Sequence, residues 1–112
     1  FSPDGTRMAV SDFAGSVALW DVATTTARVL QGPGQPITHA LAFSPDGKVL
    51  ASAGTDQTVK VWDAATGQER RTLKGHAHWV FGVAFSPDGR WLASSGEDQS
   101  VKVWRLEEPA HK

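Results

Sequence analysis

The stretch Phe-Ser-Pro-Asp-Gly at residues 43–47 decides the fold, because it occurs three times along the chain. It begins at Phe1, Phe43 and Phe85, a spacing of 42 residues. Tryptophans recur at the same spacing, at Trp20, Trp62 and Trp104. Internal repetition at about 40–45 residues is the sequence signature of a repeat architecture. The 112 residues hold two full periods and two thirds of a third, too few to close a ring of such units.

Each repeat contains four short segments that favour strands. In the middle repeat the first ends at residue 43, and the others cover residues 49–52, 58–62 and 69–73. Proline and Asp-Gly between the first two favour a tight turn, and residues 58–62 alternate polar and apolar side chains. Four short antiparallel strands separated by turns describe one blade of a propeller. We therefore predict an all-β protein of about two and two-thirds blades of four-stranded antiparallel sheet.

Composition narrows the class of protein. The net charge of −1 provides no basic field to attract nucleic acid or an anionic membrane, and no apolar run is long enough to span a bilayer. Cysteine is absent, which excludes disulfides and cysteine-based sites and favours a reducing compartment. We expect a cytoplasmic protein that binds neither nucleic acid nor membranes.

The repeated motifs resemble those of the WD-repeat family over the whole chain. In the third repeat the resemblance is carried by Gly75-His76, the turn after Phe85, Leu92-Ala93-Ser94, Asp98 and Val101-Lys102-Val103-Trp104. In the second repeat it is carried by residues 59–63. The first repeat is degenerate: it keeps Trp20-Asp21, but Ala14 replaces the expected turn aspartate and Val10 the expected serine. The resemblance implies a WD-repeat β-propeller with no catalytic residues of its own.

The phase of the repeat predicts how the blades divide. Residues 1–31 would form a blade lacking its first strand, residues 36–74 a complete blade, residues 76–106 a blade lacking its outer strand, and residues 107–112 a polar tail. A terminal blade leaves one sheet face exposed to solvent unless a cap or a partner covers it. We therefore expect the C-terminal part of a longer propeller of bacterial type. By itself it should associate with other copies, be completed by missing blades, or be marginally stable.

Ser94, His76 and Asp98 have the residue types of a hydrolase triad. No nucleophile elbow surrounds Ser94, however. The resemblance instead implies that the three form a buried hydrogen-bonded tetrad with Trp104, in which histidine bridges aspartate and serine, and serine reaches the indole N–H. We expect this structural role and keep the hydrolase as a remote alternative.

The middle repeat keeps only part of such a tetrad, Ser52, Asp56 and Trp62, because Gly34 stands where histidine would align. 

Two further groups of polar residues have plain explanations. His76 and His78 with Asp98 would supply too few ligands for a zinc site, so we predict no metal and no cofactor. The basic Arg70-Arg71 would lie on an outer strand, where charge is typical of a solvated sheet edge.

Candidate partner-binding residues follow from the resemblance. In the family, positions six and four before the turn phenylalanine, and the residue before the turn aspartate, reach the rim of the ring. Carried onto this sequence they are Trp79, Phe81, Glu97, Ile37, His39, Thr55 and, in the first repeat, Phe13. Exposed aromatic residues are enriched at binding hot spots. Alternatively, Trp79 and Phe81 fill the seam between blades, and Trp91 is expected to pack on a neighbouring blade.

These residues lead to one preferred function. We predict a non-catalytic scaffold that binds a protein or peptide. The alternative is an accessory propeller of a larger signalling enzyme, such as a protein kinase fused to WD repeats. Since folds do not fix functions, both rest partly on analogy.

Overall fold

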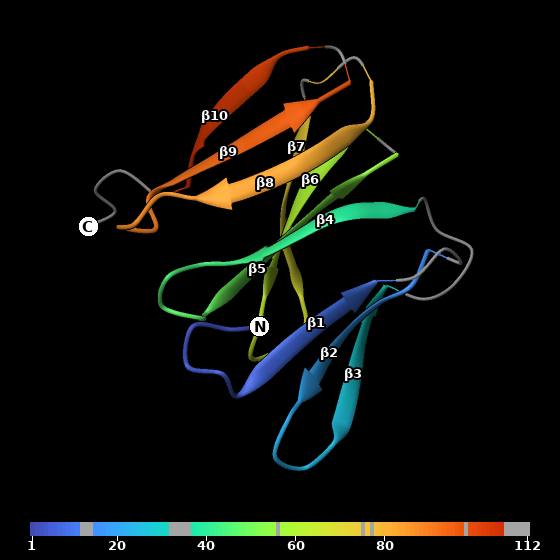
Figure 1. Ribbon diagram of the computed structural model, residues 1–112, viewed down its shortest axis with the longest axis vertical. Helices are drawn as coiled ribbons and strands as arrows, with labels where there is room; N and C mark the ends of the chain where they lie inside the picture. Colours follow the sequence, from blue (N-terminus) through green and yellow to red (C-terminus); the bar gives the residue numbers. More distant parts are fainter. Residues whose placement is uncertain are drawn as a thin grey trace.

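The computed structural model describes residues 1–11, 15–31, 37–55, 57–74, 76, 78–97 and 99–106. Within these residues the chain forms ten strands arranged in three antiparallel sheets (Figure 1). No helix occurs in the described part of the chain, and so none that could cross a membrane. The prediction of an all-β, incomplete propeller is confirmed.

Each sheet is a meander in which consecutive strands pair. The first contains β1 (Arg7–Ser11), β2 (Val17–Asp21) and β3 (Thr26–Gln31). The middle sheet contains β4 (Thr38–Phe43), β5 (Val49–Gly54), β6 (Thr58–Asp63) and β7 (Glu69–Lys74). The third contains β8 (Val80–Phe85), β9 (Trp91–Gly96) and β10 (Val101–Arg105). Strand β4 contacts both β1 and β8, so the middle sheet lies between the other two (Figure 1).

The repeated Ser-Pro-Asp-Gly sequence builds a repeated turn. The Ser44 hydroxyl donates to Asp46 Oδ1 at 2.6 Å and accepts from the Val49 N–H at 3.2 Å. The Lys48 N–H donates to the same carboxylate oxygen at 3.0 Å. Gly47 has a φ of 73°, a conformation that glycine adopts without steric cost. The same serine–aspartate bonds recur in residues 2–7 and 86–91.

Hydrogen bonds in these turns lower the pKa of the aspartates. The Thr6 N–H is the main cause for Asp4, whose pKa falls to about 2. The serine hydroxyls, Ser44 and Ser86, are the main causes of the lowered pKa values of Asp46 and Asp88. The ionised carboxylates therefore help to hold the turns at neutral pH.

Acid should weaken the fold through these turns. A folded-state pKa below the unfolded value contributes stability that is present above the unfolded pKa of about 3.9 and is lost as pH falls through the folded pKa. We expect the Tm measured by circular dichroism to be nearly constant from about pH 5 to 7 and to fall between about pH 4 and 2. Asp46→Asn should flatten this decline. A variant whose Tm falls with acid as steeply as the wild type would contradict the assignment.

The main core lies between the middle and third sheets. It is formed by buried side chains that face one another, namely Ala51, Ala53, Val59, Val61 and Leu73 from the middle sheet and Val80 and Leu92 from the third. On the other side, Val17 and Leu19 of β2 are also buried. These two valine and leucine positions are the repeat equivalents of Val59 and Val61. The same sheet face is therefore used twice to join one sheet to the next.

The third sheet carries a further copy of this face that is open to solvent. Val101 and Val103 of β10 are the repeat equivalents of Val59 and Val61, and they are 69% and 63% exposed. Because strand side chains alternate between the two faces, both valines point away from the middle sheet. The third sheet thus shows solvent the face that the middle sheet buries.

Candidate functional site

Three predicted tetrad residues of the third repeat are joined by hydrogen bonds. The Trp104 Nε1–H donates to Ser94 Oγ at 2.9 Å, and His76 Nε2 lies 2.7 Å from the same oxygen. Ser94 and His76 are both buried. Since a hydroxyl has one donor and two acceptor sites, Ser94 can accept from the indole and still donate to an unprotonated Nε2. Asp98 lies outside the described residues, so its place in the tetrad stays a prediction.

The middle repeat repeats one of these bonds. The Trp62 Nε1–H donates to Ser52 Oγ at 2.9 Å, and both residues are buried. Asp56 and Gly34 lie outside the described residues. In each of the two sheets, a serine on the second strand therefore fixes the indole of the strand beside it.

The surroundings of Ser94 do not suit a nucleophile. Its side chain is only 1% exposed, and its oxygen already accepts the indole N–H. A substrate carbonyl would have to approach this oxygen closely for attack. The geometry therefore offers a place in a hydrogen-bond network and not an accessible attacking group.

The structure brings three of the predicted rim residues together. The ring of His39 lies 5.7 Å from that of Trp79 and 5.1 Å from that of Phe81, measured between centroids. Trp79 and Phe81 meet edge to face at 6.3 Å, a favoured arrangement for aromatic pairs. Trp79 is 45% and Phe81 47% exposed. The rings therefore line the seam between β4 and β8 and also face solvent.

Backbone irregularities explain why two of these rings are exposed. The pairing of β4 with β5 skips His39, between Thr38 and Ala40. The pairing of β8 with β9 skips the repeat-equivalent residue Phe81 in the same way. A β-bulge leaves one residue outside the ladder and turns its side chain away from the regular alternation. His39 and Phe81 are the two residues at these bulges, and both are exposed.

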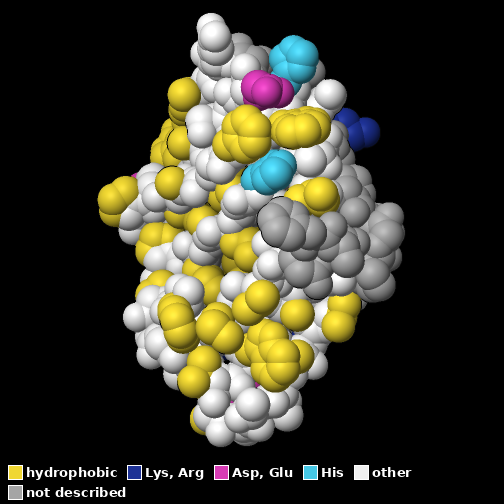
Figure 2. All heavy atoms as spheres, turned by 45° about the vertical axis from the view of Figure 1, so that its right-hand side comes forward, with side chains coloured by type: hydrophobic (Ala, Val, Ile, Leu, Met, Phe, Trp, Pro, Cys, Tyr) yellow, Lys and Arg dark blue, Asp and Glu magenta, His cyan; other side chains and the backbone are white. Residues whose placement is uncertain are grey.

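The remaining described rim residues brace this surface. The Glu97 N–H donates to the Trp79 carbonyl at 2.8 Å, and the Thr55 N–H donates in the same way to the Ile37 carbonyl at 2.9 Å. Gly54 permits the second contact, since a Cβ there would lie 1.9 Å from the Ile37 oxygen. Figure 2 shows hydrophobic and histidine side chains gathered on this face, with an acidic side chain beside them. Phe13 lies outside the described residues.

Other expected residues lie elsewhere. The Trp91 ring is 41% exposed, and the guanidinium of Arg105 in its own sheet lies 5.5 Å from its centroid. His78 is exposed, and no group of three or more histidine, aspartate or glutamate side chains in the described residues could hold a metal.

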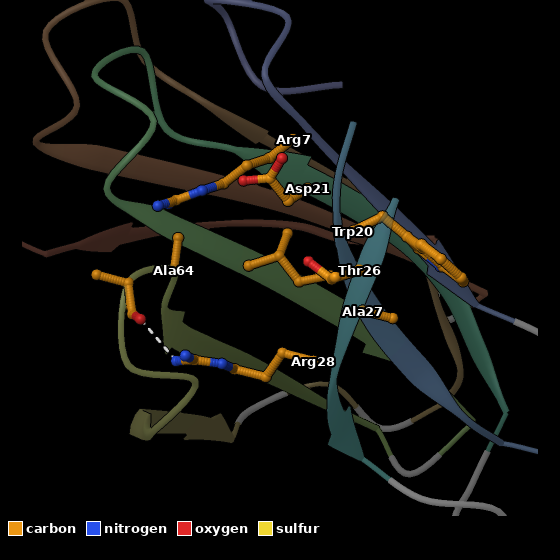
Figure 3. Close-up of a pocket in the computed structure, with 9 residues that line it drawn as sticks. Arg7, Trp20, Asp21, Thr26, Ala27, Arg28 and Ala64 are labelled. Carbon is orange, nitrogen blue, oxygen red and sulfur yellow. Dashed lines mark hydrogen bonds between the residues drawn. The ribbon is translucent and has the colours of Figure 1, made fainter. Parts of the chain in front are cut away.

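A polar hollow of about 240 Å³ lies at the other end of the strands, between the first and middle sheets (Figure 3). Arg7 and Asp21 lie side by side in it, and the charge of Arg7 helps to lower the pKa of Asp21, after the dominant hydrogen bond from the Thr24 N–H. Arg28 Nη1 donates to the Ala65 carbonyl at 2.6 Å. Its arginines are therefore matched by acceptors within the protein.

Two basic residues were not singled out from the sequence: Arg90, which lines a hollow between the middle and third sheets, and Arg105, which precedes its lining residue Leu106. The signal was present in the repeat, because Trp20 and Trp62 are each followed by aspartate and Trp104 is followed by Arg105. 

Comparisons with known proteins agree with this architecture. The family model described as WD domain, G-beta repeat matches residues 24–63 and 67–105. A solved structure titled "Structure of U3-55K" is 31% identical with a TM-score of 0.86, over 94% of this chain and 34% of the other. Another, "Crystal structure of RRP9 WD40 repeats", is 31% identical with a TM-score of 0.87, over 94% and 33%.

The chain spans about a third of the length of both solved structures. No curated protein matches it significantly. The repeat matches cover most of the sequence, and the chain belongs to the WD domain, G-beta repeat family.

Proposed function

We propose that the protein is a non-catalytic scaffold whose contact surface for a protein or peptide is the aromatic rim formed by His39, Trp79 and Phe81. The observation that carries the proposal is the meeting of three rings from two sheets, with Trp79 and Phe81 about half exposed. Large aromatic side chains supply much contact area for little conformational entropy and dominate many interfaces.

The rigidity of the rim supports this role. His39 and Phe81 project from β-bulges inside paired strands, and Trp79 is tied through its carbonyl to the Glu97 N–H. Side chains carried by a hydrogen-bonded backbone lose less freedom on binding, so more of the contact energy appears as affinity. Glu97, an exposed acidic residue, is bonded through its backbone to Trp79 of this surface. The ligand expected here has an apolar anchor with a basic residue beside it.

Two finer points belong to the same proposal. Val101 and Val103 repeat a face that is buried elsewhere in the chain, so we propose that another WD blade covers it in the working assembly. The absence of cysteine suits the reducing cytoplasm, where we place the protein.

The rim can be tested with peptides selected by display on the wild-type protein. We expect Trp79→Ser to weaken the binding of the selected peptides by about tenfold or more, the loss typical of a hot-spot aromatic residue. Affinity would be measured by fluorescence anisotropy, and folding by circular dichroism.

Trp91→Ser is the matched control, because Trp91 has nearly the same exposure as Trp79 but lies away from the aromatic rim. It should leave the affinity unchanged. Peptides that bind Trp79→Ser as well as wild type, or that are lost on Trp91→Ser, would refute the proposal.

A further inference from the structure

A basic hollow of about 460 Å³ lies between the middle and third sheets, at the end of β8 away from the aromatic rim. It is lined by Val49, Arg70, Arg71, Asp88, Gly89, Arg90 and Leu106. Trp79 precedes β8 and Asp88 follows it, and a strand of six residues is about 20 Å long. The hollow is therefore a second surface, separate from the rim.

The sequence departs from the repeat at the residue before Leu106, which lines this hollow. In the first two repeats the aspartate after tryptophan caps a turn: Asp63 Oδ1 accepts from the Ala65 and Thr66 N–H groups at 2.9 and 3.0 Å. Arg105 occupies this position in the third repeat and has no acceptor for that role. Its carbonyl accepts from Arg71 Nη1 at 3.0 Å, which ties β7 to β10.

At two other hollows of this end, the cations have acceptors within the protein. That between the first and middle sheets pairs its arginines with Asp21 and the Ala65 carbonyl. A larger hollow of about 430 Å³ lies next to it. It is lined by aspartates and cations in equal number, namely Asp4, Asp46 and Asp63 against Arg7, Lys48 and Arg70. Arg70 borders both this hollow and the basic hollow, and its charge helps to lower the pKa of Asp63, after the larger effect of backbone hydrogen bonds.

The basic hollow has more positive than negative side chains among its described lining residues. Three arginines line it, and Asp88 is the one carboxylate among its described lining residues. That carboxylate already accepts from the Ser86 hydroxyl at 2.6 Å and the Arg90 N–H at 3.0 Å. In a protein of net charge −1, this is a local excess of positive charge.

We propose that the basic hollow binds an acidic segment of a partner protein. Guanidinium groups match carboxylates in a two-bond geometry, and Arg70 and Arg90 would contact them here. Val49 and Leu106 offer apolar surface to a neighbouring side chain of the same segment. Single-stranded nucleic acid is held largely by bases stacked on aromatic rings, and the described residues lining the hollow include none. These features favour an acidic peptide that also carries apolar residues.

The probe for this site is a fluorescein-labelled peptide, Glu-Leu-Glu-Asp-Leu-Glu, followed by anisotropy. We expect binding that weakens with added salt, because exposed charges are screened. The double variant Arg70→Ser/Arg90→Ser should lose about fivefold or more in affinity, the sum expected of two exposed charge contacts. Arg70→Lys/Arg90→Lys keeps the charge but not the two-bond geometry, so its affinity should lie between those of the wild type and the serine variant. Thermal melts of each variant would check that the fold is kept.

The matched control is Arg7→Ser/Arg28→Ser, which removes the same charge from the hollow between the first and middle sheets and should change the affinity by less than about twofold. Trp79→Ser should also leave it unchanged, which separates this site from the aromatic rim. Equal losses in both double variants would reduce the effect to net charge and overturn the proposal. Absence of peptide binding, or tighter binding of oligouridylate than of the peptide, would overturn it as well.

Discussion

Leu92→Ala is expected to lower the free energy of unfolding by about 2–5 kcal/mol, the usual loss when a buried leucine is truncated and a cavity remains. Leu92 is fully buried and belongs to the cluster that joins the middle and third sheets. Because domains are stable by only about 5–15 kcal/mol, this one change removes a large part of the total. Urea unfolding followed by circular dichroism measures it directly.

Val103→Ala provides the comparison. Val103 also lies in the third sheet, but on the face open to solvent. Exposed substitutions usually change stability by less than about 0.5 kcal/mol, so this variant should unfold close to the wild type. Equal losses for Leu92→Ala and Val103→Ala would mean that the core is not where the sheets meet.

Ser94→Ala is expected to be the most damaging change among the serines. Removing Oγ leaves the Trp104 indole N–H and His76 Nε2 without this shared partner, at a site that is buried around His76 and partly buried around Trp104. Each buried polar group left unsatisfied costs about 1–3 kcal/mol. Ser52→Ala removes the partner of the Trp62 indole and should cost less, because the described middle repeat contributes one such bond. Thermal unfolding of the two variants gives the ranking.

Ser95→Ala controls for the loss of a hydroxyl as such, since Ser95 is an exposed neighbour on the same strand. It should leave the Tm nearly unchanged. The same three proteins can be assayed with a generic ester. Turnover that disappears only in Ser94→Ala, with an unchanged Tm, would restore the hydrolase reading and remove the structural one.

The elements could be predicted because their signals are local. Residues 58–62 alternate polar and apolar side chains, and the strand found there is Thr58–Asp63. Residues 69–73 were expected as the outer strand, which the structure gives as Glu69–Lys74. Proline and Asp-Gly mark the turn between the first two strands of the repeat, and the turn forms there.

The sites could be predicted only in part, because they depend on contacts between sheets. The resemblance assigned His39, Trp79 and Phe81 to the rim separately, but the meeting of their rings depends on how β4 packs against β8. The basic hollow requires Arg70 and Arg90, from two sheets, to face one space. The predicted parts played by Asp56, Asp98 and Phe13 stay predictions, since these residues lie outside those described.

If His39 and Phe81 bind a ligand as proposed, their bulges would separate recognition from folding. Each bulged residue stands outside the ladder, so the strands on either side keep their register whatever side chain it carries. A new residue there would change what the surface accepts and leave the strand pairing intact. In evolutionary terms, point substitutions at these two positions would change the exposed surface of this chain while the strand framework stays as it is.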